Sequence, residues 1–201
     1  MLPRGATGMD NSSAALAKGT ILVACECSGR VRDAFARRGW DAWSCDIKPS
    51  EVGGQHIQGD ALAAIVDRRW DMVIAHPPCT YLSAAGSQYW PKRQPEQRAA
   101  LEFVLSIFEL APWRCAIENP QGALSRLWRP PDQYVSPHYF GALQGKRTGL
   151  WLRGLPPLLA TLIRCGPKPW HPNGHRNKAT RAANRSRTSL ELAAAMAVQW
   201  S

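Results

Sequence analysis

The sequence feature that most limits the fold is a short apolar run, residues 72–75, followed almost at once by Pro77, Pro78 and Cys79. Four apolar residues between polar flanks predict a buried strand. The two prolines fix the backbone φ angle and lack an amide donor, so they end the strand and set the direction of Cys79. In open α/β sheets, ligands bind at the carboxyl ends of the strands. The run therefore predicts a thiol at a functional sheet edge, although a small buried cysteine fits the same residues.

Strand and helix patterns alternate along the rest of the chain. We expect further strands at residues 20–25, 42–45, 56–60, 113–117, 138–141 and 148–152, and helices at 31–38, 61–66, 96–110 and 189–200. Loops are expected at 83–95 and 122–137, with a polar turn at 144–147. This alternation predicts an α/β fold with a mostly parallel sheet. The first strand, helix and second strand, closed by Asp46, are typical of the nucleotide-binding half of a Rossmann-like fold.

Length and cysteine usage predict one domain in a reducing compartment. The chain has 201 residues, 45% of them hydrophobic and 20% charged, which suits a single core without metal or disulfide support. Three of the six cysteines lie in apolar, strand-like runs, and no signal-peptide core or membrane-length apolar segment is evident. We expect a cytoplasmic protein that does not enter the membrane, with a flexible leader at 1–18 and the domain at 19–201.

The net charge is strongly positive. Lys and Arg number 25 against 15 Asp and Glu, which gives +10, and segment 164–187 holds seven basic residues and no acidic one. Such an excess favours an anionic polymer such as DNA, although a solvated tail fits segment 164–187 about as well.

Polar residues follow four of the expected strands. Asp46, Asp60, Cys79 and Glu118 each stand at or just beyond a predicted strand end. A parallel sheet places such ends along one edge, where a thiol and a carboxyl group in one crevice suggest covalent catalysis with acid assistance. Helix capping by Asp60 is the structural alternative for that residue.

Two motifs resemble those of the DNA cytosine-5 methyltransferases. Pro78-Cys79, with Asp71 before it and Ser83 and Ala85-Gly86 after it, is similar to the family's Pro-Cys motif. Glu118-Asn119-Pro120 is similar to its Glu-Asn-Val motif and lies at about the usual distance downstream. The resemblance extends from residue 20 to about 151 and includes the C-terminal helix.

The resemblance implies a Rossmann-like S-adenosylmethionine-dependent methyltransferase fold and S-adenosylmethionine as the methyl donor, with S-adenosylhomocysteine as its product. Matching positions to the family's motifs gives an implied cofactor site formed by Cys25, Glu26, Ser28, Gly29, Asp46, Ile47, Asp60, Ala61 and Pro77.

The same resemblance implies the catalytic roles. Cys79 would add to C6 of a cytosine that is flipped out of the duplex or single-stranded, and Glu118 would hold a proton near N3, helped by a raised pKa. Asn119 would orient the loop, and Arg147 or Lys146 would lower the pKa of the thiol. The implied substrate-binding residues are Pro78, Ser83, Trp90 and Gln144.

The segment 152–187 is short and basic where the family has a target-recognition domain, so weak sequence preference is expected, as in compact phage or prophage members acting in bacterial or phage-infected cells. Three alternatives remain: a related enzyme acting on a nucleotide or RNA, one using a modified S-adenosylmethionine, and a catalytically inactive DNA-binding relative. Cys165, His171 and His175 lack a fourth partner for a zinc site, so we expect no metal.

Overall fold

The computed structural model describes residues 17–163, 168–169 and 187–201. Helices alternate with strands along most of this length. The strands are β1 (Thr20–Ala24), β2 (Asp41–Asp46), β3 (His56–Gln58), β4 (Met72–Ala75), β5 (Arg114–Pro120), β6 (Gln133–Val135), β7 (Gln144–Gly145), β8 (Thr148–Arg153) and β9 (Lys168–Pro169). The helices are α1 (Arg30–Ala36), α2 (Ala61–Asp67), η1 (Ala84–Lys92), α3 (Gln94–Leu110), α4 (Leu124–Leu127), η2 (Pro137–Tyr139) and α6 (Leu190–Gln199), of which η1 and η2 are 3₁₀ helices.

The main sheet has seven strands in the order β3-β2-β1-β4-β5-β8-β6. The first five are parallel, whereas β8 runs antiparallel to both β5 and β6. The order reverses direction between β1 and β4, because the chain leaves β1 for β2 on one side and later returns to β4 on the other. Such a switch point is where Rossmann-like folds open a crevice at the carboxyl ends of the strands. The predicted α/β class and mostly parallel, Rossmann-like sheet are confirmed.

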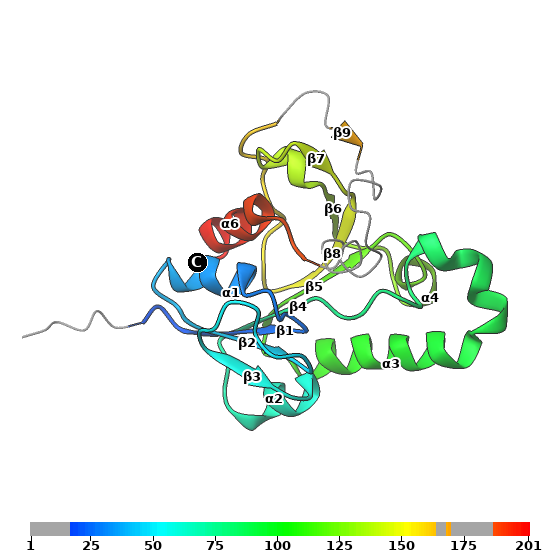
Figure 1. Ribbon diagram of the computed structural model, residues 1–201, viewed down its shortest axis with the longest axis horizontal. Coiled ribbons are helices and arrows are strands. Elements are labelled where there is room, and N and C mark those ends of the chain that lie inside the picture. The colour runs from blue at the N-terminus through cyan, green and yellow to red at the C-terminus, as the bar shows by residue number, and fades with distance from the viewer. Residues whose placement is uncertain (1–16, 164–167, 170–186) are drawn as a thin grey trace, which may run out of the picture.

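Helices cover both faces of the sheet (Figure 1). Ile21 and Val23 of β1 join the core cluster shared with α1 and α6, and Leu22 and Ala24 join the cluster shared with α2 and α3. This alternation follows from the period of two residues in a strand. Because both faces are buried, the central strands are apolar throughout, which explains why β4 has four fully buried residues.

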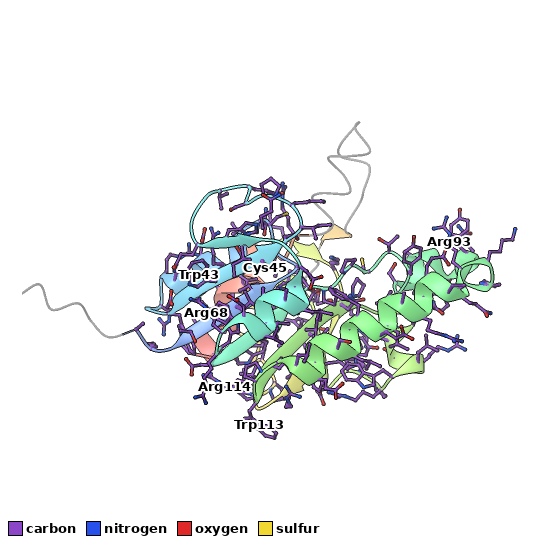
Figure 2. All side chains as sticks on the ribbon, turned by 90° about the horizontal axis from the view of Figure 1, so that it is seen from below. Trp43, Cys45, Arg68, Arg93, Trp113 and Arg114 are labelled. Carbon is purple, nitrogen blue, oxygen red and sulfur yellow. The ribbon has the colours of Figure 1, made fainter. Side chains whose placement is uncertain are left out.

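The helix α3 is longer than the part of the sheet that it covers. Its buried residues, Val104 and Ile107, belong to its second half. Its first turns and η1 extend past the sheet and form a projection, residues 84–98, that we call the α3 arm (Figure 1). Figure 2 places Arg93 at the far end of this arm, with Trp113 and Arg114 at the opposite end of α3.

Most expected elements are confirmed, with three corrections. Residues 138–141 do not form a strand: Pro137 instead begins the short 3₁₀ helix η2, where its fixed φ angle suits a first helical position. The expected loop 122–137 contains α4 and the strand β6, and the expected loop 83–95 is largely the 3₁₀ helix η1.

Several predictions lie partly or wholly outside the described residues. They concern the leader 1–18, most of the basic segment 164–187, and Cys165, His171 and His175. In the part of the chain that the structure describes, no helix is long and apolar enough to cross a membrane. Within those same ranges, no group of three or more His, Cys, Asp and Glu side chains could hold a metal ion.

Candidate functional site

The turn after β4 carries Cys79 out of the sheet. His76 still belongs to the sheet hydrogen bonding, since its amide donates to the carbonyl oxygen of Ala24 at 2.9 Å. Pro77 is buried and Pro78 is exposed, so the chain leaves the core between them. The carbonyl oxygen of Cys79 then accepts hydrogen bonds from the amides of Leu82 and Ser83. The turn thus places a half-buried thiol beyond the end of β4.

Glu118 lies in the neighbouring strand β5, just beyond the end of its pairing with β4. The β4–β5 pairing ends at Ala75 and Ile117, and Glu118 is the next residue of β5. Its side chain is 13% exposed, and its Oε2 lies 3.1 Å from Nδ1 of His76. Its Oε1 accepts a hydrogen bond from Oγ1 of Thr148. Both carboxylate oxygens therefore already have donors facing them.

These contacts determine the charge of Glu118. Burial alone raises the pKa of the carboxyl group, but the hydrogen bond and charge of His76, the charge of Lys146 and the hydrogen bond from Thr148 together lower it to about 2. Donors that face a carboxylate favour its ionised form. The expectation of a raised pKa for Glu118 was therefore wrong for the protein without substrate, because it counted burial and missed the donors.

Asn119 links the two strand ends. Its side chain is 1% exposed, and its Nδ2 donates a hydrogen bond to the carbonyl oxygen of Pro77 at 2.9 Å. Its Oδ1 is buried without a hydrogen-bond partner among the described residues. The predicted orienting residue thus contacts the turn that carries Cys79.

The residues between β7 and β8 separate into two roles. The charge of Lys146 acts on Glu118, as its effect on the pKa of that carboxyl group indicates. Arg147 is exposed, and its guanidinium carbon lies 4.0 Å from the centre of the Tyr134 ring on β6. Gln144 begins β7, outside the main sheet. Of the two predicted cations, Lys146 is the one whose charge reaches the strand-end carboxylate.

The loop from β1 to α1 turns sharply at the sheet edge. Cys25 has a φ angle of 59°, a left-handed conformation that residues other than glycine rarely adopt, and Gly29 has a φ angle of 70°. The Cys25 thiol is largely buried beside Asp46 and Asp60, and burial followed by these charges raises its pKa to about 12. Cys25 is therefore a neutral thiol at physiological pH.

Glu26 is occupied by the protein itself. It is 5% exposed, and its carboxylate accepts hydrogen bonds from the amide of Val31 at 2.8 Å, the amide of Arg32 at 3.2 Å and the hydroxyl of Ser28 at 3.2 Å. These amides open α1 and have no partner within the helix, so Glu26 acts as the helix cap. Glu26 and Ser28 thus shape the loop through internal contacts.

The ends of β2 and β3 supply two carboxylates. Asp46 is half-buried, and its Oδ1 accepts a hydrogen bond from the amide of Lys48 at 2.9 Å. Ile47, directly after it, is 76% exposed. Asp60 caps α2 by accepting a hydrogen bond from the amide of Ala63, and Ala61 is buried. The alternative that Asp60 caps a helix is confirmed. Ile47, exposed beside Asp46, is suited to contact an aromatic ring.

The predicted substrate residues do not gather in one place: Pro78 lies in the turn after β4, Gln144 in β7, Trp90 in the α3 arm and Ser83 just before it. Ser83 forms an isolated bridge with Gly122, which joins the segment after Cys79 to the segment after β5. The Trp90 ring packs against the α2/α3 core cluster, and its Nε1 is buried without a hydrogen-bond partner among the described residues. Tyr89 is 53% exposed, and the guanidinium carbon of Arg93 lies 5.7 Å from its ring centre. The open aromatic face on the arm is therefore that of Tyr89.

Two residues of this site were missed by the sequence analysis. His76 and Thr148 face Glu118 from β4 and β8. The one available signal was the position of His76 directly before two prolines at a strand end. Beside the β1–α1 loop there is a further hollow of about 720 Å³, which shares Ser28 with the predicted cofactor residues and is otherwise lined by residues of α1, the β2–β3 loop and the start of α6.

Comparisons with known proteins find likeness among solved structures. No protein-family model matches the chain, and no curated protein matches it. Among solved structures, the chain is similar to a candidate DNA modification methyltransferase encoded within an E. coli prophage, with 15% sequence identity and a TM-score of 0.47. The likeness covers 72% of this chain and 51% of the other, so this chain spans about half the length of the protein it matches.

Proposed function

We propose that the protein transfers a methyl group from S-adenosylmethionine to C5 of a cytosine in DNA, with little sequence preference. The observation that carries the proposal is the hydrogen bond from Asn119 to Pro77, at 2.9 Å. Through it, the turn that bears Cys79 and the strand end that bears Glu118 are held as one unit. A nucleophilic thiol and an anionic carboxylate at adjacent strand ends suit the addition of a thiolate to an electron-poor pyrimidine.

In the proposed reaction, Cys79 supplies the nucleophile. Its thiolate adds to C6 of the cytosine, which breaks the C5–C6 double bond and makes C5 nucleophilic. After C5 has gained the methyl group, water takes the C5 proton, the C6–S bond breaks to return the Cys79 thiolate, and the ring becomes aromatic again. S-adenosylmethionine, when bound, supplies the electrophilic methyl group as a sulfonium. Cys79 is therefore regenerated in each cycle.

Glu118 has the geometry to bind the pyrimidine edge. An ionised carboxylate accepts hydrogen bonds, and each of its oxygens has a second lone pair beyond those used by His76 and Thr148. The 4-amino group of cytosine is a donor that such a carboxylate can bind. Lys146 lies close enough to act on the charge of Glu118 and would steady the site as negative charge develops on the base.

The residues at the switch point fit an adenosine-bearing cofactor. Asp46, half-buried at the end of β2, can accept hydrogen bonds from ribose hydroxyls, and the exposed Ile47 beside it offers an apolar contact for an adenine ring. Cys25 and Gly29 have positive φ angles, which suit a sharp turn whose backbone would approach the cofactor. Asp60, Ala61 and Pro77 would border the same crevice from β3, α2 and β4.

A base inside a duplex cannot reach Cys79, so the substrate cytosine would be flipped out or single-stranded. The α3 arm begins just after Cys79 and carries the exposed Tyr89 and the cation Arg93, which suit stacking on bases and contact with phosphates. Segment 154–189, between β8 and α6, is too short for a separate recognition domain, which supports weak sequence preference.

The test is incubation of the protein with DNA and labelled S-adenosylmethionine, followed by digestion and mass spectrometry of the nucleosides. We expect 5-methylcytosine with wild type and none with Cys79→Ser. The matched control is Cys27→Ser, another half-buried thiol at this sheet edge, which should keep activity. DNA containing 5-fluorocytosine should trap a covalent complex with wild type and Cys27→Ser but not with Cys79→Ser. Absence of modified cytosine, or undiminished product from Cys79→Ser, contradicts the proposal.

The same assay separates the alternatives. RNA, free cytidine nucleotide and DNA are offered in parallel at equal cytosine concentration, and the product mass identifies the transferred group. Exclusive labelling of RNA or nucleotide would replace the proposed substrate, and a product heavier than 5-methylcytosine would replace the proposed donor.

A further inference from the structure

His76 is a buried histidine at the centre of the site. It follows β4 directly, and its side chain is 7% exposed. Its Nδ1 lies 3.1 Å from Oε2 of Glu118 and 3.3 Å from Oγ1 of Thr188, which precedes α6. Its Nε2 is buried and has no hydrogen-bond partner among the described residues. A buried histidine with one ring nitrogen on a carboxylate and the other unpaired is arranged to gain and lose a proton.

Glu118 by itself is poorly suited to donate a proton. Its two oxygens face the donors His76 and Thr148, and such contacts keep a carboxylate ionised. Yet addition of a thiolate at C6 pushes electron density towards N3 of the base, which must then bind a proton. A titratable group in contact with Glu118 can supply that proton, and the Nδ1 of His76 lies within hydrogen-bond distance of the carboxylate.

We propose that His76 stores the proton that Glu118 delivers to N3 of the target base and takes back at the end of the reaction. This role rests on the proposed function. His76 acts through Glu118 and is therefore a positioning residue that also holds a proton.

The proton transfers balance, with water as the acceptor of the proton that C5 loses after methylation. At the start His76 is an imidazolium and Glu118 a carboxylate. As the Cys79 sulfur bonds to C6, N3 takes a proton from Glu118, and Oε2 of Glu118 takes the Nδ1 proton, which leaves His76 neutral. When the C6–S bond breaks, N3 returns its proton to Glu118 and Glu118 returns one to Nδ1. The original charges are then restored.

The groups that face this pair define the expected pH dependence. Glu118 meets His76 from β5 and Thr188 meets it from the segment before α6, while Lys146 acts on Glu118 from the β7–β8 turn. Methyl transfer needs a thiolate at Cys79 and a proton on His76. The rate should therefore rise with pH as Cys79 ionises and fall again as His76 loses its proton.

The experiment is the pH–rate profile of methyl transfer, at saturating DNA and cofactor, for wild type and His76→Asn. Asparagine places an amide donor near the position of Nδ1 but holds no titratable proton. We expect His76→Asn to be about 10-fold or more slower on the acidic side of the wild-type optimum, to lack the alkaline fall, and to approach the wild-type rate at alkaline pH. The matched control is His138→Asn. His138 lies in η2, and its Nδ1 forms a hydrogen bond with the hydroxyl of Ser136, the residue before η2. This variant should keep the wild-type profile.

The outcomes separate the two proposals. Wild-type protein that modifies no cytosine overturns the proposed function and this role together. Active wild type with an unaltered His76→Asn profile overturns only the role of His76. Should His76→Asn fail to fold, the imidazole of His76 can be titrated by NMR in wild type and Glu118→Gln. Loss of the carboxylate should move the midpoint to lower pH, and an unchanged midpoint overturns the coupling.

Discussion

Asn119 donates a hydrogen bond from Nδ2 to the carbonyl oxygen of Pro77, and this single bond joins the ends of the adjacent strands β5 and β4. Proline has no amide hydrogen, so its carbonyl oxygen is the one backbone polar group by which the turn can be held at Pro77. Because Asn119 is 1% exposed, water does not compete for this bond. The position of Cys79 relative to Glu118 therefore depends on the side chain of Asn119.

Replacing Asn119 by alanine should cost both stability and activity. The change leaves the Pro77 carbonyl buried without its donor, which should lower the free energy of unfolding by about 1–3 kcal/mol. The turn that carries Cys79 would also no longer be held in a fixed position relative to Glu118. We therefore expect kcat to fall by a larger factor than KM rises. Urea unfolding and methyl-transfer kinetics measure the two effects. The control Gln199→Ala removes a side-chain amide that bonds to Leu159, outside the site, and should affect stability alone. Equal kinetic losses in both variants would contradict the role of Asn119.

Gly122 should be intolerant of a side chain. A Cβ atom at this position would lie 1.9 Å from the carbonyl oxygen of Leu82, a backbone atom that cannot move alone. Gly122→Ala should therefore push apart the segments after Cys79 and after β5, with a loss of roughly 1–3 kcal/mol in unfolding free energy and of most activity. Gly59→Ala is the matched control, because a Cβ there meets nothing within 4 Å. Denaturant unfolding measures the stability of both variants. Equal stability of the two would contradict the close contact between Gly122 and the carbonyl oxygen of Leu82.

The core of the fold could be predicted from the sequence because its signals are local. Four consecutive apolar residues in β4 suffice for a strand buried on both faces, and Pro112 marks where α3 must end. The edge strand β6 gives no such signal: Gln133–Val135 follows two prolines and is a strand because it pairs with β8. Tertiary pairing therefore decided what local propensity could not.

The site was predictable in its strand-end residues but not in their contacts. Cys79 and Glu118 follow apolar runs, so the sequence places them at one edge. The donors to Glu118 are His76, 42 residues earlier, and Thr148, 30 residues later, and no spacing rule connects positions so far apart. Likewise, the sequence suggests that Glu26 is a polar residue of a ligand-binding loop. In the structure its carboxylate accepts hydrogen bonds from backbone amides at the start of α1.

Asp46 should contribute to cofactor binding through its charge. Asp46→Asn keeps an oxygen that can accept from the Lys48 amide, so the fold of the loop should survive. A neutral amide binds ribose hydroxyls less strongly than a carboxylate, and we expect the Kd for S-adenosylmethionine to rise about 10-fold. Isothermal titration calorimetry with S-adenosylmethionine and S-adenosylhomocysteine measures the change. Asp41→Asn, at the other end of β2, is the control and should bind as wild type does. Equal affinities for all three proteins would exclude Asp46 from the cofactor site.

Glu118 should make the protein sensitive to acid. Its pKa lies near 2 in the folded protein, below the ordinary 4.5, so its stabilising effect is complete above pH 4.5 and is lost as the pH falls towards 2. Between pH 7 and pH 3, wild type should lose roughly 2 kcal/mol more unfolding free energy than Glu118→Gln, which has no carboxylate to protonate. Urea unfolding at both pH values gives the difference. Glu102→Gln, an exposed change on α3, should decline as wild type does. A parallel decline of Glu118→Gln and wild type would mean that Glu118 is not held as an anion by His76 and Thr148.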